Sequence, residues 1–294
     1  MRHGRWRFLL GALVPALVLH VVFVLSPYAQ AFYLSLTDWT GVAGEAHYVG
    51  AGNYARLGGD SLFLDAVRNN AVMLVVVPFV TIAIGLGLAS LLRKGRGAGG
   101  YQIVYFFPQL LSLVVIGVLW GFVYNPNTGL LNSGLRAVGL GSLAQSWLAE
   151  PVFALAAVMA VLVWSSVGFY VVLFRAAIDG IPPELYEAAL LDGAGAWTTF
   201  RRITVPLVRE TVQVAFVYLG IAALDGFAVV QVMTVGPGGP DGATEVIGLS
   251  LYRNAFTYGK FGYASAMGVA LFFATLTLAV LALRAGRRER LELA

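Results

Sequence analysis

Long apolar runs recur along almost the whole chain and are separated by short polar segments. Strands of a transmembrane barrel would instead alternate in polarity over segments of about ten residues. A helix needs about 20 consecutive apolar residues to cross a bilayer, and the runs have roughly this length. The pattern therefore predicts six membrane-spanning helices, at residues 8–25, 71–92, 103–124, 152–174, 212–235 and 263–283.

Composition supports the same class. Apolar residues make up 59% of the 294 residues and charged residues 12%, whereas soluble domains have about 45–50% and about 25%. An all-α polytopic membrane protein is expected, with residues 1–294 forming one transmembrane domain. Cysteine is absent, which excludes disulfides, thiolate metal sites and a cysteine nucleophile.

Lys and Arg are distributed unequally between the segments that separate the runs. Fourteen of the 19 fall on the side that carries both termini. Basic residues favour the cytoplasmic side of a membrane, so both termini are expected to be cytoplasmic. The formal charge of +4 then reflects membrane topology. A nucleic-acid surface would need interleaved aromatic residues, and none is evident.

Two glycine patterns carry no chemistry. Gly95, Gly97 and Gly100 have GxGxxG spacing, but they lie in a short turn between apolar runs instead of between a strand and a helix. Gly259-Lys260 lacks the glycine loop and the following Ser or Thr of a phosphate loop. The three histidines are scattered. No ATP-binding, cofactor, metal or catalytic site is expected in this chain.

The cytoplasmic segment 175–210 is the only one on that side long enough to fold as a docking element. Pro183 suits the first turn of a helix, where its missing N–H costs nothing. Gly193 can adopt the left-handed conformation that ends a helix. A second short helix is expected at about 197–203 and should stop before Pro206. The segment thus predicts a helix–turn–helix.

This segment resembles the EAA loop of ABC importer permeases, which reads Glu-Ala-Ala, then Gly, then Ile-x-x-Pro. Segments 33–39, 125–132, 242–245 and 261–266 are similar to the carbohydrate-uptake branch, in particular to the larger maltose permease and the glycerol-phosphate type. The residues that the resemblance assigns to ATPase coupling are Glu187, Ala188, Ala189, Asp192, Gly193, Ile203 and Pro206.

The resemblance implies a type I importer permease fold in the bacterial inner membrane, with this chain as a non-enzymatic subunit. It also implies a heterodimer with a second permease, a pair of ATPase subunits that use ATP and Mg²⁺, and an extracellular binding protein that delivers a sugar or related polar solute. Glu187 would offer its carboxylate to a basic groove of the ATPase. Its alternative role is only to favour the N-terminal half of its helix.

Asp225 is the one charged residue within the predicted spans. A carboxylate there should face the bundle or a water-filled cavity. It is expected on the substrate path, with an internal polar clasp or a neutral, protonated carboxyl as alternatives. Tyr170 and Ser166 lie four residues apart in the fourth span and are candidate companions. Gln231 is a further candidate. An unbroken helix would place it on a different face from Asp225, and a kink at Gly226 is the open alternative.

An ion-gradient-driven transporter or a channel is the alternative from another class, because an intramembrane carboxylate also suits a proton or cation site. Secondary carriers commonly contain internal repeats, and none is convincing here. A membrane enzyme is disfavoured, because no nucleophile, metal cluster or carboxylate pair converges within the spans.

Overall fold

The computed structural model describes residues 11, 13–42, 44–92, 104–234 and 238–290. These residues are helical apart from connections and one isolated β-bridge between Thr37 and Tyr48, which confirms the all-α class. The start of the expected first span at residues 8–10, the loop around Gly95 and the end of the expected fifth span at residue 235 lie outside the described residues.

Several of the described helices are long and apolar enough to cross a membrane. Four do so alone: Leu13–Leu34, Ser61–Leu91, Pro151–Asp179 and Phe261–Leu281. Two bent pairs make six when each pair is counted as one span: Val104–Leu110 with Leu113–Val123, and Ala196–Leu207 with Arg209–Leu224. The described residues thus contain four to six spans, in agreement with the six apolar runs.

The chain is organised as two compact units. The smaller comprises Met1–Asp60 and Ser250–Phe273, and the larger comprises Ser61–Leu249 and Ala274–Ala294. The division falls within two helices, α14 (Ile247–Tyr252) and α15 (Phe261–Arg290).

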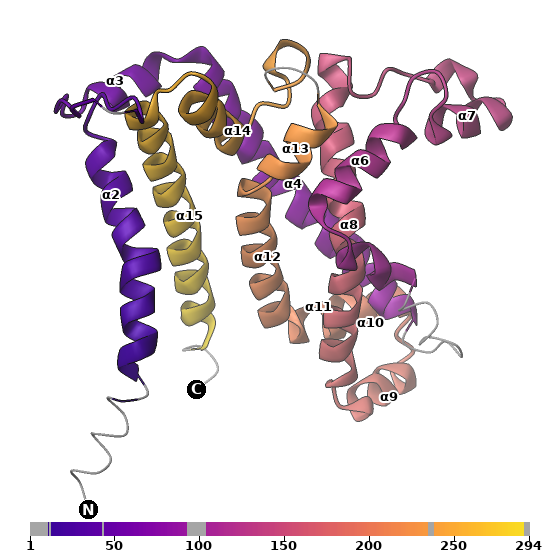
Figure 1. Ribbon diagram of the computed structural model, residues 1–294. Helices are drawn as coiled ribbons and strands as arrows, with labels where there is room; N and C mark the ends of the chain where they lie inside the picture. The colour runs from indigo at the N-terminus through magenta and orange to yellow at the C-terminus, as the bar shows by residue number, and fades with distance from the viewer. Residues whose placement is uncertain (1–10, 12, 43, 93–103, 235–237, 291–294) are drawn as a thin grey trace, which may run out of the picture. The chain divides into compact units, whose positions relative to one another are not determined.

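The smaller unit contains the first helix, whose labelled part is α2 (Ser26–Leu34), together with α3 (Gly52–Gly59) and the beginning of α15 (Figure 1). Phe32 packs against Phe272 and Phe273, with ring centroids 5.7 and 5.9 Å apart. Apart from this aromatic contact the first helix is exposed, because none of the residues in its apolar stretch is buried within the chain.

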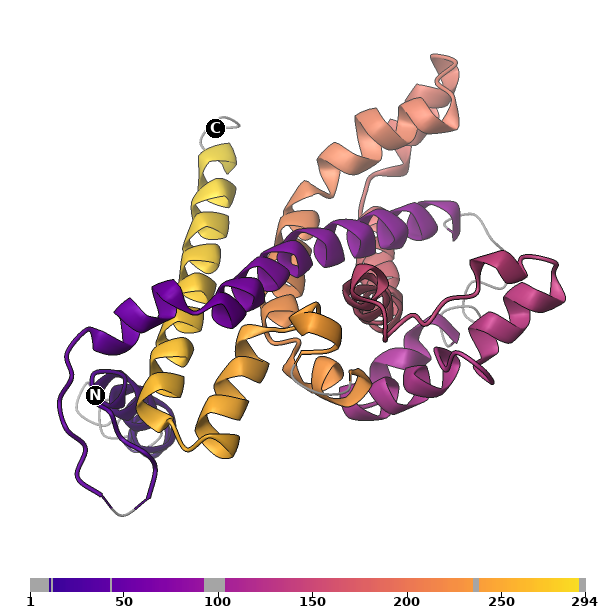
Figure 2. The ribbon, with the colours of Figure 1, turned by 90° about the horizontal axis from the view of Figure 1, so that it is seen from above.

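The larger unit is built on α4 (Ser61–Leu91) and α8 (Pro151–Asp179), which pack against each other. Seen from above, α8 is viewed end-on and α4 runs past it (Figure 2). The remaining helices of the unit are α6 (Leu113–Val123), α7 (Leu130–Ala137), α9 (Pro183–Leu191), α10 (Ala196–Thr199), α11 (Val205–Leu207), α12 (Arg209–Leu224) and α13 (Phe227–Met233). The core between these helices is apolar and includes Met73, Val77, Ile116, Val161 and Val230.

The third span is sharply bent where a single helix over 103–124 was expected. The segments Val104–Leu110 and Leu113–Val123 meet at 114°. Pro108 lies at the start of a 3-10 turn, and Leu111 is extended, with φ −83° and ψ 144°. The Ser112 side chain then accepts a hydrogen bond from the Val115 N–H and caps α6. The bend is stable because the new helix start has a partner for an otherwise unpaired donor.

The fifth span, expected at 212–235, is also interrupted, and the break includes Gly226, where the sequence leaves a kink open. The helix α12 ends at Leu224, and α13 begins at Phe227. Asp225 and Gly226 between them have ψ of 25° and 8°. Both residue types are poor helix formers, because aspartate competes for backbone hydrogen bonds and glycine loses the most backbone entropy.

Candidate functional site

Segment 175–210 folds as a helical hairpin, and its first helix is the one expected from the prolines and glycine. The helix α9 begins at Pro183 and ends at Leu191. Gly193 follows with φ +73°, and the N–H groups of Gly193 and Ala194 donate to the Leu190 and Ala189 carbonyls at 3.1 and 2.9 Å. This is the hydrogen-bond pattern by which a left-handed glycine ends a helix.

The second arm of the hairpin runs further than expected. It comprises α10, a π-helical turn at Phe200–Thr204 and α11, so the helix passes through Pro206 instead of stopping before it. The Val205 N–H donates to Phe200 O, five residues back. Because the register changes at this turn, the donor that Pro206 lacks falls where the hydrogen-bond ladder is already interrupted.

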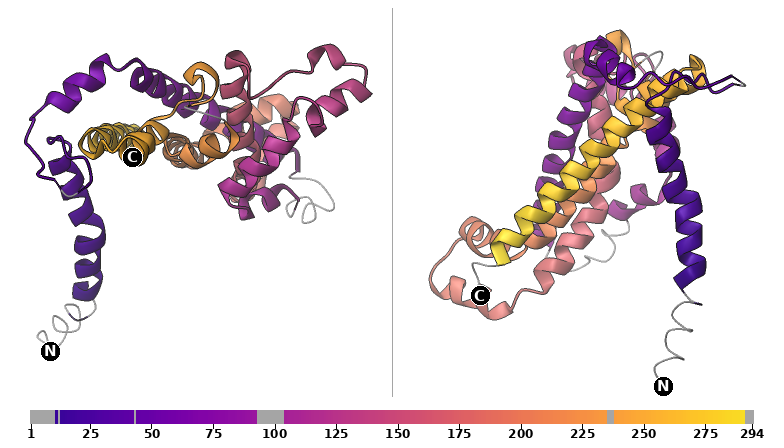
Figure 3. Two further views of the ribbon diagram at one scale, coloured as in Figure 1. Left: turned by 45° about the horizontal axis from the view of Figure 1, so that its top comes forward. Right: turned by 90° about the vertical axis from the view of Figure 1, so that its left-hand side faces the viewer.

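Contacts at its base attach the hairpin to the membrane helices. The hydroxyls of Tyr186 and Thr204 lie 3.2 Å apart, which joins the two arms. Tyr186 and Phe200 pack against a buried cluster that contains Phe174, Ile178 and Val208. The hairpin projects beyond the end of α8 (Figure 3). It is therefore held by the end of α8 and the start of α12. A cavity of about 400 Å³ is lined by both arms and by the ends of α4 and α8.

The outer surface of the hairpin carries both charge and apolar area. Glu187, Ala188, Asp192 and Pro206 are exposed, Ile203 is half-buried, and Ala189 is buried. Only one of the two alanines thus offers a surface with little side chain.

Five large apolar side chains on the same hairpin are exposed, and three of them are exposed by at least 70%: Leu190 at 75%, Leu191 at 89% and Trp197 at 70%. The EAA pattern does not identify them. Their signal was present in the sequence, because exposed apolar residues in a polar segment between spans indicate a partner surface.

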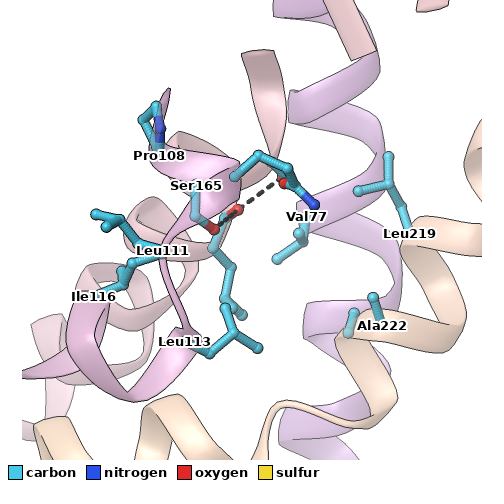
Figure 4. Close-up of a pocket in the computed structure, with 12 residues that line it drawn as sticks. Val77, Pro108, Leu111, Leu113, Ile116, Ser165, Leu219 and Ala222 are labelled. Carbon is cyan, nitrogen blue, oxygen red and sulfur yellow. Dashed lines mark hydrogen bonds between the residues drawn. The ribbon is translucent and has the colours of Figure 1, made fainter. Parts of the chain in front are cut away.

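A second feature is a cavity of about 200 Å³ within the larger unit. Its lining comes from α4, the bent third span, α8 and α12. Figure 4 shows Leu111, Leu113 and Ile116 on one side of the cavity and Leu219 and Ala222 on the other.

The polar groups of this cavity are Gln109, Ser165 and Ser166. Both serine hydroxyls donate to Leu162 O, at 2.9 and 2.7 Å. A hydroxyl that donates to its own helix keeps acceptor lone pairs. Gln109 adds an amide that donates and accepts, so the cavity offers a small number of polar groups in an apolar surround.

The four residues predicted for the substrate path do not all gather at this cavity. Ser166 lines it, and Asp225 follows Ala222 and Ala223, which also line it. Asp225 is exposed in this chain, as is Gln231 on α13.

Tyr170 is buried and packs against Phe169 and Phe174, with ring centroids 5.2 and 6.2 Å apart, and it is not among the lining residues. Gln109 and Ser165 were missed by sequence reasoning. Gln109 follows Pro108 inside an apolar run, and this polar residue beside a proline was the available signal.

In the described part of the chain, no three His, Asp or Glu side chains converge as a metal site.

Residues 81–290 match the family described as "Binding-protein-dependent transport system inner membrane component". The chain belongs to this family. It is 45% identical to the diacetylchitobiose uptake system permease of Streptomyces coelicolor, over 94% of this chain and 81% of that protein. It is 31% identical to the multiple sugar-binding transport system permease of Streptococcus mutans, over 98% and 96%.

The fold is also similar to a solved structure. A chain of a bacterial ABC transporter involved in the import of the acidic polysaccharide alginate superposes with a TM-score of 0.83, over 97% of this chain and 96% of that one, at 23% identity. The protein is thus a membrane-embedded permease subunit of an ABC importer that depends on a binding protein. The ion-gradient alternative has no support, and the permease is not itself catalytic.

Proposed function

We propose that this permease carries a short oligosaccharide across the cytoplasmic membrane. It would act as one half of a heterodimer with a second permease, with both termini in the cytoplasm. A pair of ATPase subunits, which bind ATP and Mg²⁺, would drive it, and an extracellular binding protein would deliver the sugar. The similarity to a diacetylchitobiose permease and a multiple-sugar permease supports this substrate class.

The observation that carries the proposal is the form of the cytoplasmic hairpin. Glu187 offers a carboxylate to a basic groove, and Leu191 and Trp197 offer exposed apolar area that a partner would cover. Buried aromatic and aliphatic contacts, with a polar rim, are what stabilise a protein interface. The remaining residues of the proposed coupling set form or end the two arms.

The attachment of the hairpin suggests how ATP binding reaches the membrane. Tyr186 joins the two arms through Thr204, and Phe200 packs on the ends of α8 and α12. Close-packed contacts of this kind transmit displacement instead of absorbing it. When the ATPase dimer closes on ATP, movement of the hairpin would therefore pass to these spans.

The membrane cavity supports a polar path for the sugar. Ser165, Ser166 and Gln109 supply acceptors and donors for hydroxyl groups. Asp225, directly after α12, would add a strong acceptor, with Gln231 beyond it on α13. Tyr170 would act indirectly, because it lies in the packing between α8 and α4.

The size of the cavity bears on the partner. Its 200 Å³ is below the roughly 300–1,000 Å³ of small-molecule sites. It would therefore hold only part of a sugar, and the second permease would complete the site.

Uptake by the reconstituted importer tests this function. The permease, its partners and the binding protein are placed in proteoliposomes, and entry of labelled diacetylchitobiose, maltose and an amino acid is measured. We expect a sugar to enter with ATP present and no ion gradient. Uptake that follows a proton or sodium gradient without ATP, or uptake of the amino acid alone, would refute the proposal.

A further inference from the structure

The interruption of the fifth span leaves backbone groups that need partners. A helix end has four carbonyls without intrahelical donors. Within a bilayer such groups are costly when no partner is supplied. At the end of α12, Ile221 O accepts from the Asp225 N–H at 3.2 Å. The carbonyl of Leu224, the last residue of α12, accepts from a donor on another element.

That donor is Asn70, on α4. Its side-chain amide nitrogen lies 3.3 Å from Leu224 O and donates to it. Its side-chain oxygen accepts from the Ile247 N–H at 2.8 Å. Asn70 is only 1% exposed. One buried carboxamide thus joins the last residue of α12 to the first residue of α14, across 154 and 177 residues of sequence.

The neighbouring Asn69 makes a separate set of contacts. Its amide nitrogen lies 3.1 Å from Ala243 O and 2.9 Å from Glu245 O. These carbonyls belong to the loop before α14, whereas the donor to Leu224 O is Asn70. Two adjacent asparagines therefore hold two different segments, which provides a matched control within the chain.

The same face of α4 leads from this contact to the membrane cavity. Ala66, Asn70, Met73 and Val77 have helical spacing and are all buried. A Cβ added to Gly226 would lie 2.9 Å from Met73 Cε, so Met73 packs directly against the interruption. Val77 lines the cavity. Asn70 is therefore placed where α4, the interruption and the route to the cavity meet.

We infer that Asn70 is a positioning residue for transport: by satisfying Leu224 O and the Ile247 N–H, it fixes the interruption of the fifth span and thereby the location of the Asp225 carboxylate. The transport part of this inference rests on the proposed function. Loss of two hydrogen bonds at a buried site shifts the balance between interrupted and continuous helix by roughly tenfold or more.

The interruption is tested by a distance measurement in the assembled importer. This chain has no cysteine. Within it, spin labels therefore attach only at two introduced cysteines, which replace the exposed residues Val214 on α12 and Gln231 on α13. In a continuous helix these positions would lie roughly 25 Å apart. We expect Asn70→Leu to shift the distances toward that value and broaden them, and Asn69→Leu to leave them unchanged.

If Asn70→Leu does not assemble, Asn70→Asp provides a second variant of the same size. Its carboxylate still accepts from the Ile247 N–H but does not donate to Leu224 O, so the same shift is expected. An unchanged distribution in either folded Asn70 variant would overturn the inference. An equal shift in Asn69→Leu would overturn the assignment to Asn70.

Transport separates positioning from folding. Per assembled complex, we expect Asn70→Leu to raise the half-saturating sugar concentration or lower the maximal uptake rate by roughly tenfold. A merely structural residue would change only the amount of complex. If the distance shifts but uptake is unchanged, Asn70 does fix the interruption, and the place of Asp225 on the substrate path is refuted.

Discussion

Gly168 in α8 marks a place where two backbone segments touch, and its substitution tests the bent third span. A Cβ added at Gly168 would lie 1.7 Å from Tyr105 O and 2.3 Å from Tyr105 C. Ordinary van der Waals contact is 3.4–4 Å. The obstructing atoms belong to the backbone, so Gly168→Ala must displace the helix Val104–Leu110 from α8.

The magnitude follows from two opposing effects. Overpacking typically costs about 1–3 kcal/mol of stability, and a backbone overlap this close is expected to cost about 3 kcal/mol. Replacing a helical glycine by alanine contributes about 1 kcal/mol in the other direction. We therefore expect Gly168→Ala to lower the free energy of unfolding by about 2 kcal/mol, which corresponds to a fall in Tm of roughly 4–8 °C.

The displaced helix also carries Pro108 and Gln109, which line the membrane cavity, so ATP-driven uptake should fall together with Tm. Gly121→Ala in α6 is the matched control, because a Cβ there meets nothing within 4 Å. It should raise stability by about 0.5–1 kcal/mol. Thermal unfolding of the purified complex and uptake in proteoliposomes measure both effects. If Gly168→Ala proved as stable as the wild type, the close approach of α8 to Tyr105 would be refuted.

Two further substitutions test the proposed coupling and path residues. Glu187→Lys reverses an exposed charge, so it should leave the permease folded while ATPase capture and ATP-driven uptake fall. Glu184→Lys on the same helix is the control and should have a smaller effect. Normal ATPase capture by the Glu187 variant would refute the docking role of Glu187. Asp225→Ala should lower uptake through loss of a hydrogen-bond acceptor, with stability unchanged because the side chain is exposed. Reduced stability with full uptake would instead identify Asp225 as an internal clasp.

The sequence alone determined the class and the approximate spans, and it predicted segment 175–210 as a folded docking element. Apolar runs identify spans because a bilayer requires a fixed length of apolar helix. The helix α9 was predictable because Pro183 and Gly193 act on their own backbone, one by its fixed φ and the other by its access to positive φ. The EAA pattern likewise lies within one short segment, so a linear sequence displays it completely.

Only the tertiary structure decided where the third and fifth spans are interrupted and which polar groups share a cavity. Asn70 and Leu224 are 154 residues apart in the sequence. Gln109 and Ser165 line the same cavity because α8 packs against the bent third span at Gly168. Inside a membrane, a helix ends where another element supplies partners for its backbone groups. Those partners come from segments that are distant in the sequence. A pattern within one short segment therefore does not predict them.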